Sequence, residues 1–266
     1  MDTLTDGEMG PAEAFERLVD VMERLRSDDG CPWDREQTLS SLKPFLLEET
    51  YEVLEAIDSE NVDDHKEELG DLLLQVLFQS KIREEEGSFD IAEVARGITD
   101  KLIRRHPHVF AGERLASSEE VVQNWEDIKR NEKKDRDSIL DGVPEALAAL
   151  LRSQRLQEKA ARAGFDWEHT EDVWPKVEEE MEELRQAEAS GDAASVEQEV
   201  GDLLFSVVNL SRHLGVDAED ALRKSSRRFE RRFREVERRL SKRGRSPSEA
   251  SLQELDELWD EVKSEE

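Results

Sequence analysis

Four carboxylates with fixed spacing occur twice in this chain. The two sets are Glu49, Glu52, Glu68 and Asp71, and Glu180, Glu183, Glu199 and Asp202. The offset along the sequence between a member of the first set and its counterpart in the second is identical for all four pairs. Carboxylates gathered without His or Cys are a typical ligand set for a hard divalent cation. The spacing therefore predicts a site for Mg²⁺, or for Mn²⁺ in its place, rather than for Zn²⁺.

Helical geometry would bring the members of each pair together. Residues three apart in an α-helix lie within about 60° of each other, so each ExxE or ExxD pair shares one face. Leu203, Leu204 and Val207 follow Asp202 with the spacing of a buried stripe, which places the acids at the edge of an apolar face. If two such helices pack antiparallel, four carboxylates converge. Each like-charged pair about 4 Å apart then costs on the order of 4 kcal/mol at an effective dielectric constant near 20, and a cation removes that cost.

The plain alternative is a solvated acidic face, because charged residues make up 39% of the chain. For a single EExxE motif, that alternative is the more common explanation. Two ordered copies, each followed by an ExxD pair that opens an apolar helix, favour a metal site instead.

Composition limits the fold and the class of partner. Aromatic residues make up only 6% of the chain, and no β-branched run alternates with polar residues, so we expect an all-α protein. The formal net charge of −29 argues against general binding to nucleic acid or to an acidic membrane. Cys31 is the one cysteine, which excludes an internal disulfide and a zinc site built on two cysteines. Without a long apolar run or a signal peptide, we expect a soluble protein of the cytoplasm.

The repeat predicts two tandem helical domains, 11–134 and 144–266, joined by a polar linker at 135–143 that contains Gly142. The helices expected from periodicity and capping are 11–27, 42–59, 62–86, 91–105, 118–134, 144–163, 171–189, 193–214, 218–242 and 248–263. The two halves would therefore carry the same elements in the same order.

Several longer motifs add to the repeated acids. They are GCPWD at 30–34, LEETYEVLEAI at 47–57, ELGDLLLQV at 68–76, RRHPHVF at 104–110, GFDW at 164–167, SVVNLSRH at 206–213 and RFERRFREVE at 228–237. Together they closely resemble the MazG family of nucleoside triphosphate pyrophosphohydrolases, over nearly the whole chain. This resemblance implies an all-α fold with four-helix-bundle cores, a homodimer, and Mg²⁺-dependent cleavage of nucleoside triphosphates to monophosphate and pyrophosphate. It also implies a house-cleaning role against aberrant or excess nucleotides.

The two halves differ beside their acids. At the same offset as the acids, Lys176 and Asn209 in the second half stand where the first half has Phe45 and Phe78. A triphosphate needs positive or hydrogen-bond-donating groups near the metal, so we expect the second half to be catalytic. The resemblance implies the same division, with the first half serving mainly assembly. The first-half acids are nevertheless a possible second metal site.

Further candidates surround the second-half acids. Glu179 lies four residues before Glu183 and could orient or deprotonate a water. The resemblance implies that Arg228 and Arg232 grip the phosphates and that Trp259 contacts the base. The alternatives for these three are helix-surface ion pairs for the arginines and anchoring of the last helix for the tryptophan.

Other functions stay open at this point. A relative that is selective for one nucleotide, such as a dUTP or dCTP pyrophosphatase, would carry the same acids. A helical scaffold or regulator could bind nucleotide or metal without turnover, although Lys176 and Asn209 beside intact acids count against it. RNA binding by the arginine-rich helix is disfavoured by the interleaved Glu230, Glu235 and Glu237.

Overall fold

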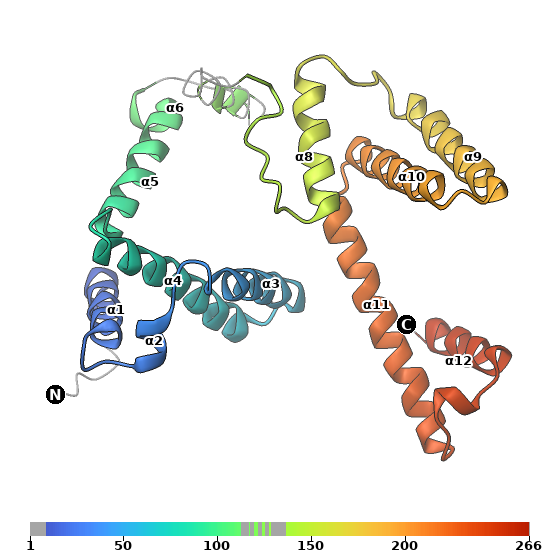
Figure 1. Ribbon diagram of the computed structural model, residues 1–266, viewed down its shortest axis with the longest axis horizontal. Coiled ribbons are helices and arrows are strands. Elements are labelled where there is room, and N and C mark those ends of the chain that lie inside the picture. The colour runs from blue at the N-terminus through green and yellow to red at the C-terminus, as the bar shows by residue number, and fades with distance from the viewer. Residues whose placement is uncertain are drawn as a thin grey trace. The chain divides into compact units, whose positions relative to one another are not determined.

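The computed structural model describes residues 9–112, 117, 120, 121, 124, 125, 128 and 137–265. These residues form helices, turns and loops, and none of them is in a β-strand, which confirms the all-α class. The chain divides into two compact units, Met1–Lys133 and Lys134–Glu266 (Figure 1). The 118–134 helix predicted from the sequence lies mostly outside the described residues.

A helical hairpin is the central element of each unit. In the first unit α3 (Lys43–Ser59) packs against α4 (Val62–Glu85), and in the second α9 (Trp174–Ser190) packs against α10 (Ala193–His213) (Figure 1). The first helices of the two hairpins begin at positions separated by the same offset as the repeated acids, and so do the second helices. The register of the sequence repeat is therefore also the register of the structure.

The turn of each hairpin follows from local chemistry. In the second unit α9 ends at Ser190 and is followed by Gly191, whose φ of 74° lies in the left-handed region that glycine adopts without strain. The Asp192 carboxylate then accepts a hydrogen bond from the Ala194 amide at 3.2 Å and caps α10. In the first unit Glu60 takes the left-handed position with a φ of 55°, and Asn61 caps α4.

The remaining described helices of the first unit are α1 (Pro11–Arg26), α2 (Pro32–Glu36), α5 (Ile91–Arg105) and α6 (Pro107–Phe110). Helix α1 packs on α4, and the core between them is built from Met22, Leu42, Phe78 and Ile82. The short helices α2 and α6 were not predicted, and each begins with a proline, which suits the first turn of a helix.

In the second unit, α8 (Ala149–Arg162) packs on α10, and the 3₁₀-helix η1 (Thr170–Asp172) leads into α9. Helix α11 (Ala218–Lys242) carries η2 (Pro247–Glu249) and α12 (Leu252–Ser264) at its C-terminal end (Figure 1). Val173, Val177 and Leu210 form the core of the hairpin side, while Val236, Leu240, Leu258 and Val262 form that of the α11–α12 side.

Three predicted helix starts were too early by three residues or more. Helix α8 begins at Ala149 rather than at 144, since the backbone of Ala148, with a ψ of 139°, is not yet helical. Helix α9 begins at Trp174 rather than at 171, with Pro175 in its first turn. Helix α12 begins at Leu252 rather than at 248, because the Ser251 hydroxyl accepts the Glu254 amide and caps the helix there.

The predicted buried stripe after Asp202 is only partly right. Leu203 packs against the hairpin core, but Leu204 is 51% exposed and Val207 is also exposed. One chain alone therefore leaves these two side chains accessible. Among the described helices, none is long and apolar enough to cross a membrane.

Candidate active site

Three of the four predicted second-unit carboxylates come together in the folded chain. Oxygen atoms of Glu180, on α9, and of Glu199 and Asp202, on α10, all lie within 4.8 Å of one another. Glu180 is buried, Glu199 is half-buried and Asp202 is exposed. The group is therefore closed at Glu180 and open to solvent at Asp202. Such an oxygen-only set suits Mg²⁺ or Mn²⁺.

Glu183 lies beside this group rather than within it. Loss of hydration is the largest cause of the raised pKa of Glu183, and the negative charges of Glu180 and Glu199 add to it. Glu183 therefore interacts electrostatically with two members of the group, and the other three predicted acids share one possible ion position.

Lys176 lies one turn before Glu180 on α9. Its ammonium is 2.8 Å from the Glu180 carboxylate and 3.0 Å from that of Glu179. The pKa of Lys176 is raised above its usual value by the hydrogen bond to Glu180 and then by that to Glu179. The lysine is thus fully charged at the edge of the acidic group, and Glu179, predicted as a base, is its exposed partner.

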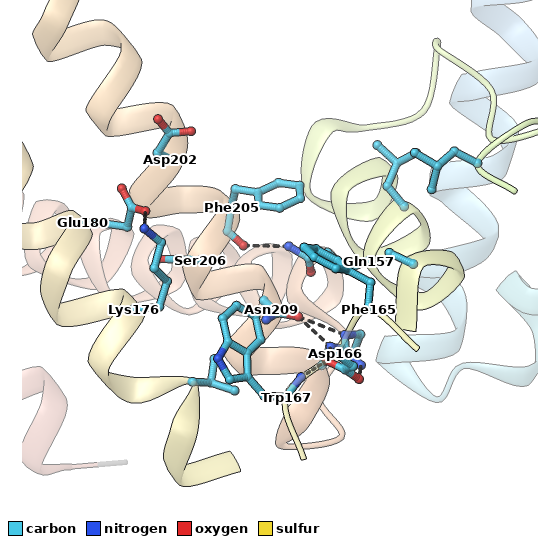
Figure 2. Close-up of a pocket in the computed structure, with 15 residues that line it drawn as sticks. Gln157, Phe165, Asp166, Trp167, Lys176, Glu180, Asp202, Phe205, Ser206 and Asn209 are labelled. Atoms are coloured by element: carbon cyan, nitrogen blue, oxygen red, sulfur yellow. Dashed lines mark hydrogen bonds and ion pairs between the residues drawn. The ribbon is translucent and has the colours of Figure 1, made fainter. Parts of the chain in front are cut away.

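A cavity of about 330 Å³ opens beside the carboxylates, between α8 and the α9–α10 hairpin. Its lining is mostly apolar and comprises Leu140, Leu156, Gln157, Ala160, Phe165, Asp166, Trp167, Val173, Lys176, Glu180, Asp202, Phe205, Ser206, Asn209 and Arg212. Figure 2 shows Glu180 and Asp202 together at one side of this group, with Asn209, Asp166 and Trp167 at another. The possible metal site and the cavity therefore share two side chains.

A polar cluster fixes the cavity end away from the carboxylates. The Arg212 guanidinium donates to both Asp166 oxygens at 2.9 and 2.5 Å, and the His213 Nε2 lies 2.9 Å from the same carboxylate. Arg212 also donates to the Asn209 Oδ1 at 2.7 Å. The hydrogen bond from Arg212 is the largest cause of the low pKa of Asp166, about 2. Asn209 is therefore held in one orientation.

Gln157 reaches the cavity from α8. Its Nε2 donates to the backbone carbonyl of Phe205 at 2.8 Å and ties α8 to α10 (Figure 2). Its Oε1 is buried and has no hydrogen-bond partner among the described residues. A buried acceptor without a donor is unfavourable in a folded protein, so this oxygen needs an explanation.

The structure places Arg232 and Trp259 in a different cluster, and Arg228 lies one turn before Arg232 on α11. Trp259, on α12, packs on the α11–α12 core with its ring centroid 5.2 Å from that of Phe229. The Arg232 guanidinium carbon lies 5.8 Å from the Trp259 ring centroid, and Arg228 donates to the Ser225 hydroxyl at 3.3 Å. Within the part of the chain that is described, these three side chains do not line the cavity. Their predicted contacts with substrate stay predictions.

The first unit repeats the carboxylates without the polar neighbours. Oxygen atoms of Glu49, Glu68 and Asp71 lie within 4.8 Å of one another. Loss of hydration is the largest cause of the raised pKa of Glu49, followed by the charges of Asp71 and Glu52, so Glu52 belongs to the same group. Phe78 stands at the position that corresponds to Asn209, where it is 3% exposed in the core.

Sequence reasoning missed the role of several cavity residues. Phe165, Asp166 and Trp167 lie in the GFDW motif and Arg212 lies in SVVNLSRH, so both motifs had been noted. Their mutual contact spans 46 residues of sequence, and no local pattern indicates it. Gln157 carried no sequence signal, since a glutamine on a helix is usually exposed.

Comparison with known proteins finds the same family domain in each half of the chain. The family model described as "MazG nucleotide pyrophosphohydrolase domain" matches residues 37–110 and again residues 168–236. A nucleoside triphosphate pyrophosphohydrolase of Escherichia coli is 48% identical over 257 residues, which cover 95% of this chain and 98% of that protein. A protein of Thermotoga maritima named nucleoside triphosphate pyrophosphohydrolase/pyrophosphatase MazG is 49% identical over 250 residues, covering 94% and 95% of the two chains.

Proposed function

The chain belongs to the MazG family, and from that premise we propose that it hydrolyses nucleoside triphosphates to nucleoside monophosphate and pyrophosphate. The names of the relatives from Escherichia coli and Thermotoga maritima support this reaction. One structural observation carries the proposal: three converging carboxylates and a charged lysine stand at the edge of a cavity. A house-cleaning role in the cytoplasm, where such nucleotides are made and used, is part of the same proposal.

The residues present fit a magnesium ion. Glu180, Glu199 and Asp202 would hold it, with Glu183 at their edge, because they offer only oxygen atoms and carry more negative charge than Lys176 neutralises. When bound there, Mg²⁺ supplies neutralisation of phosphate charge and acidifies a water for attack on phosphorus. Mn²⁺ has similar ligand preferences and is a possible substitute.

The chain's own groups then account for orientation. Lys176 is within reach of Glu180 and is placed to donate to a phosphate oxygen that arrives beside the acids. Glu179 is exposed and accepts a hydrogen bond from the same Lys176 ammonium. In the structure this carboxylate therefore helps to orient the lysine. Its predicted role as a base toward water would require it to leave that ion pair.

We also propose a homodimer. Met181, Val200, Leu204 and Val207 are exposed apolar side chains of the α9–α10 hairpin, and several such side chains on one helical hairpin favour an interface. A second copy packed on this face would complete a four-helix arrangement and would be able to supply Arg228, Arg232 and Trp259 to the phosphates or base. Sedimentation of the wild type and of Leu204→Glu tests this, and a monomeric wild type would contradict it.

The reaction is tested by identifying its products. With Mg²⁺ present, we expect every cleaved nucleoside triphosphate to give monophosphate and pyrophosphate in equal amounts, separated by ion-exchange chromatography. Glu48→Ala removes a carboxylate of the first-unit hairpin that belongs to neither converging group, and as a control it should form the same products as the wild type. Release of diphosphate and orthophosphate, or the absence of turnover with both Mg²⁺ and Mn²⁺, would refute the proposal.

A further inference from the structure

We propose that Lys159 is a positioning residue for the reaction, because it holds a surface strap, residues 138–142, in a closed position at the rim of the cavity. The inference rests on the proposed function and adds to it an element that opens and closes the site. It concerns how often the site is closed rather than which groups recognise the nucleotide.

The strap lies in the second unit, before α8, and its backbone forms a turn. The Asp141 amide donates to the Ser138 carbonyl at 3.1 Å, and the Asp141 carboxylate accepts the Ser138 amide at 3.0 Å. The Leu140 amide donates to the Ser138 hydroxyl at 3.2 Å. Gly142 follows with a φ of 85°, a left-handed conformation that glycine adopts without strain. Local hydrogen bonds therefore define the shape of the strap.

Lys159, in the last turn of α8, joins the strap to that helix. Its ammonium donates to the Ile139 carbonyl at 3.2 Å and to the Asp141 carbonyl at 3.0 Å. Hydrogen bonds from a charged donor are stronger than those between neutral groups. We call these two hydrogen bonds the latch. They lie on either side of Leu140 in the sequence, so the latch fixes the residue between them.

Leu140 is the residue of the strap that lines the cavity. It does so together with Leu156 and Ala160 of α8. Leu140 is also 40% exposed, so it lies at the rim of the cavity rather than at its base. Because the latch binds both neighbouring residues, release of the latch would free this part of the cavity wall.

Polar contacts rather than burial hold the strap in place. All five of its residues are exposed, and even the apolar Ile139 is 47% exposed. Segments that bury little apolar surface open locally at a low cost in free energy. A short turn also loses more backbone entropy on ordering than its few hydrogen bonds return, so it stays folded only while it is attached. The strap therefore has a closed and an open state, and Lys159 stabilises the closed one.

The latch should act on substrate affinity rather than on the chemical step. A ligand that requires the closed site binds only the closed fraction of molecules, so its apparent affinity falls in proportion to that fraction. Saturating ligand then shifts the population back to the closed state. Loss of the latch should therefore raise KM and leave kcat unchanged, whereas general damage to the fold would not separate the two constants.

Steady-state kinetics test this separation. Lys159→Met keeps the aliphatic stem but removes the ammonium, and we expect KM for ATP to rise about 10-fold with kcat within about twofold of the wild type. Lys159→Arg keeps charged donors and should hold KM within about threefold of the wild type. Lys242→Met, which removes a lysine from the last turn of α11, is the matched control and should change neither constant. An unchanged KM in Lys159→Met would overturn the inference.

Hydrogen exchange followed by mass spectrometry observes the strap without turnover. In the free protein, the strap amides should exchange about 10-fold faster in Lys159→Met than in the wild type, while those of the α9–α10 hairpin should not change. Saturating α,β-methylene-ATP with Mg²⁺ should slow strap exchange in both proteins to the same level. Equal exchange in the two free proteins would show that Lys159 does not hold the strap.

Leu140→Ala separates the cavity wall from the latch. It keeps the backbone carbonyls that Lys159 binds, and the exposure of Leu140 indicates that the fold tolerates the change. We expect KM for ATP to rise about fivefold, with strap exchange in the free protein as in the wild type. A wild-type KM in Leu140→Ala would show that the strap does not contribute to the substrate site.

The outcomes separate this inference from the proposed reaction. Strap exchange in the wild type that does not respond to α,β-methylene-ATP would overturn the inference even if the enzyme releases pyrophosphate from ATP. A protein in which the analogue closes the strap as expected, but which releases no pyrophosphate from ATP, would support the inference and refute the reaction.

Discussion

The two units share a hairpin and its carboxylates but differ in what lies behind them. In the second unit the positions of Lys176 and Asn209 border a cavity. In the first unit the corresponding Phe45 and Phe78 belong to the core with Met22 and Leu42. The carboxylate pattern is therefore repeated, while the two positions beside it border a cavity in the second unit and pack into the core in the first.

The same contrast holds one turn further along. Arg212 binds Asp166 and Asn209 at the end of the cavity. Lys81, its counterpart in the first unit, pairs with Glu84 at 3.1 Å instead. Arginine donates through a planar fork to two partners at once, whereas lysine offers a single ammonium. Lys81 therefore does not bridge two side chains in the way that Arg212 bridges Asp166 and Asn209.

The largest effect should come from removing an acid of the second unit. Glu180→Ala deletes the buried member of the converging group, and we expect pyrophosphate release from ATP to fall by at least about 100-fold. Glu49→Ala removes its first-unit counterpart and should cost less than about threefold. Steady-state kinetics of the two variants decide the matter, and equal losses would show that both units are catalytic.

Phe78→Ala should reduce the unfolding free energy of the first unit more than the corresponding change, Asn209→Ala, reduces that of the second. Truncating this buried ring removes core contacts with Met22 and Ile82, and we expect the first unit to lose about 3–5 kcal/mol of unfolding free energy. Asn209→Ala, at the cavity wall, should destabilise the second unit by less. Urea denaturation followed by circular dichroism measures both changes. A smaller loss for Phe78→Ala than for Asn209→Ala would contradict the assignment of a filled core to the first unit.

Asn209→Phe transfers the first-unit residue to the second unit. The larger ring should fill part of the cavity and remove the amide, so we expect kcat/KM for ATP to fall about 10- to 100-fold. Affinity for Mg²⁺ should stay within about twofold, because the three carboxylates are unchanged. Calorimetric titration with Mg²⁺ provides that second value, and undiminished turnover of ATP would show that the cavity is not needed.

The smallest effect concerns pH. Arg212 holds the folded-state pKa of Asp166 at about 2, below its usual 3.8, so the ionised form is the one that stabilises the fold. This contribution is fully present above about pH 4 and is lost as the pH falls toward 2. Asp166→Asn should therefore be less stable than the wild type at pH 7, and the difference should shrink below pH 4. Urea midpoints across this range test it, and a constant difference would contradict the ion pair.

Much of the hairpin could be predicted from the sequence, since its signals are local. Both hairpin helices of the second unit were predicted within three residues at each end, because Pro175, Gly191 and Asp192 mark their ends. The starts of α8 and α12 could not be placed as well. The helical sequence pattern extends before the true start of each helix. In α12, for example, the cap at Ser251 sets the start at Leu252.

The sequence by itself determined the repeat, the family and the carboxylates, because side-chain spacing on a helix follows directly from residue number. Tertiary structure alone decided which groups share a space. It joined Arg212 to Asp166, left the Gln157 oxygen buried without a donor among the described residues, and placed Trp259 on a different core from the cavity. Contacts between residues far apart in the chain depend on how helices pack, and no local pattern encodes that packing.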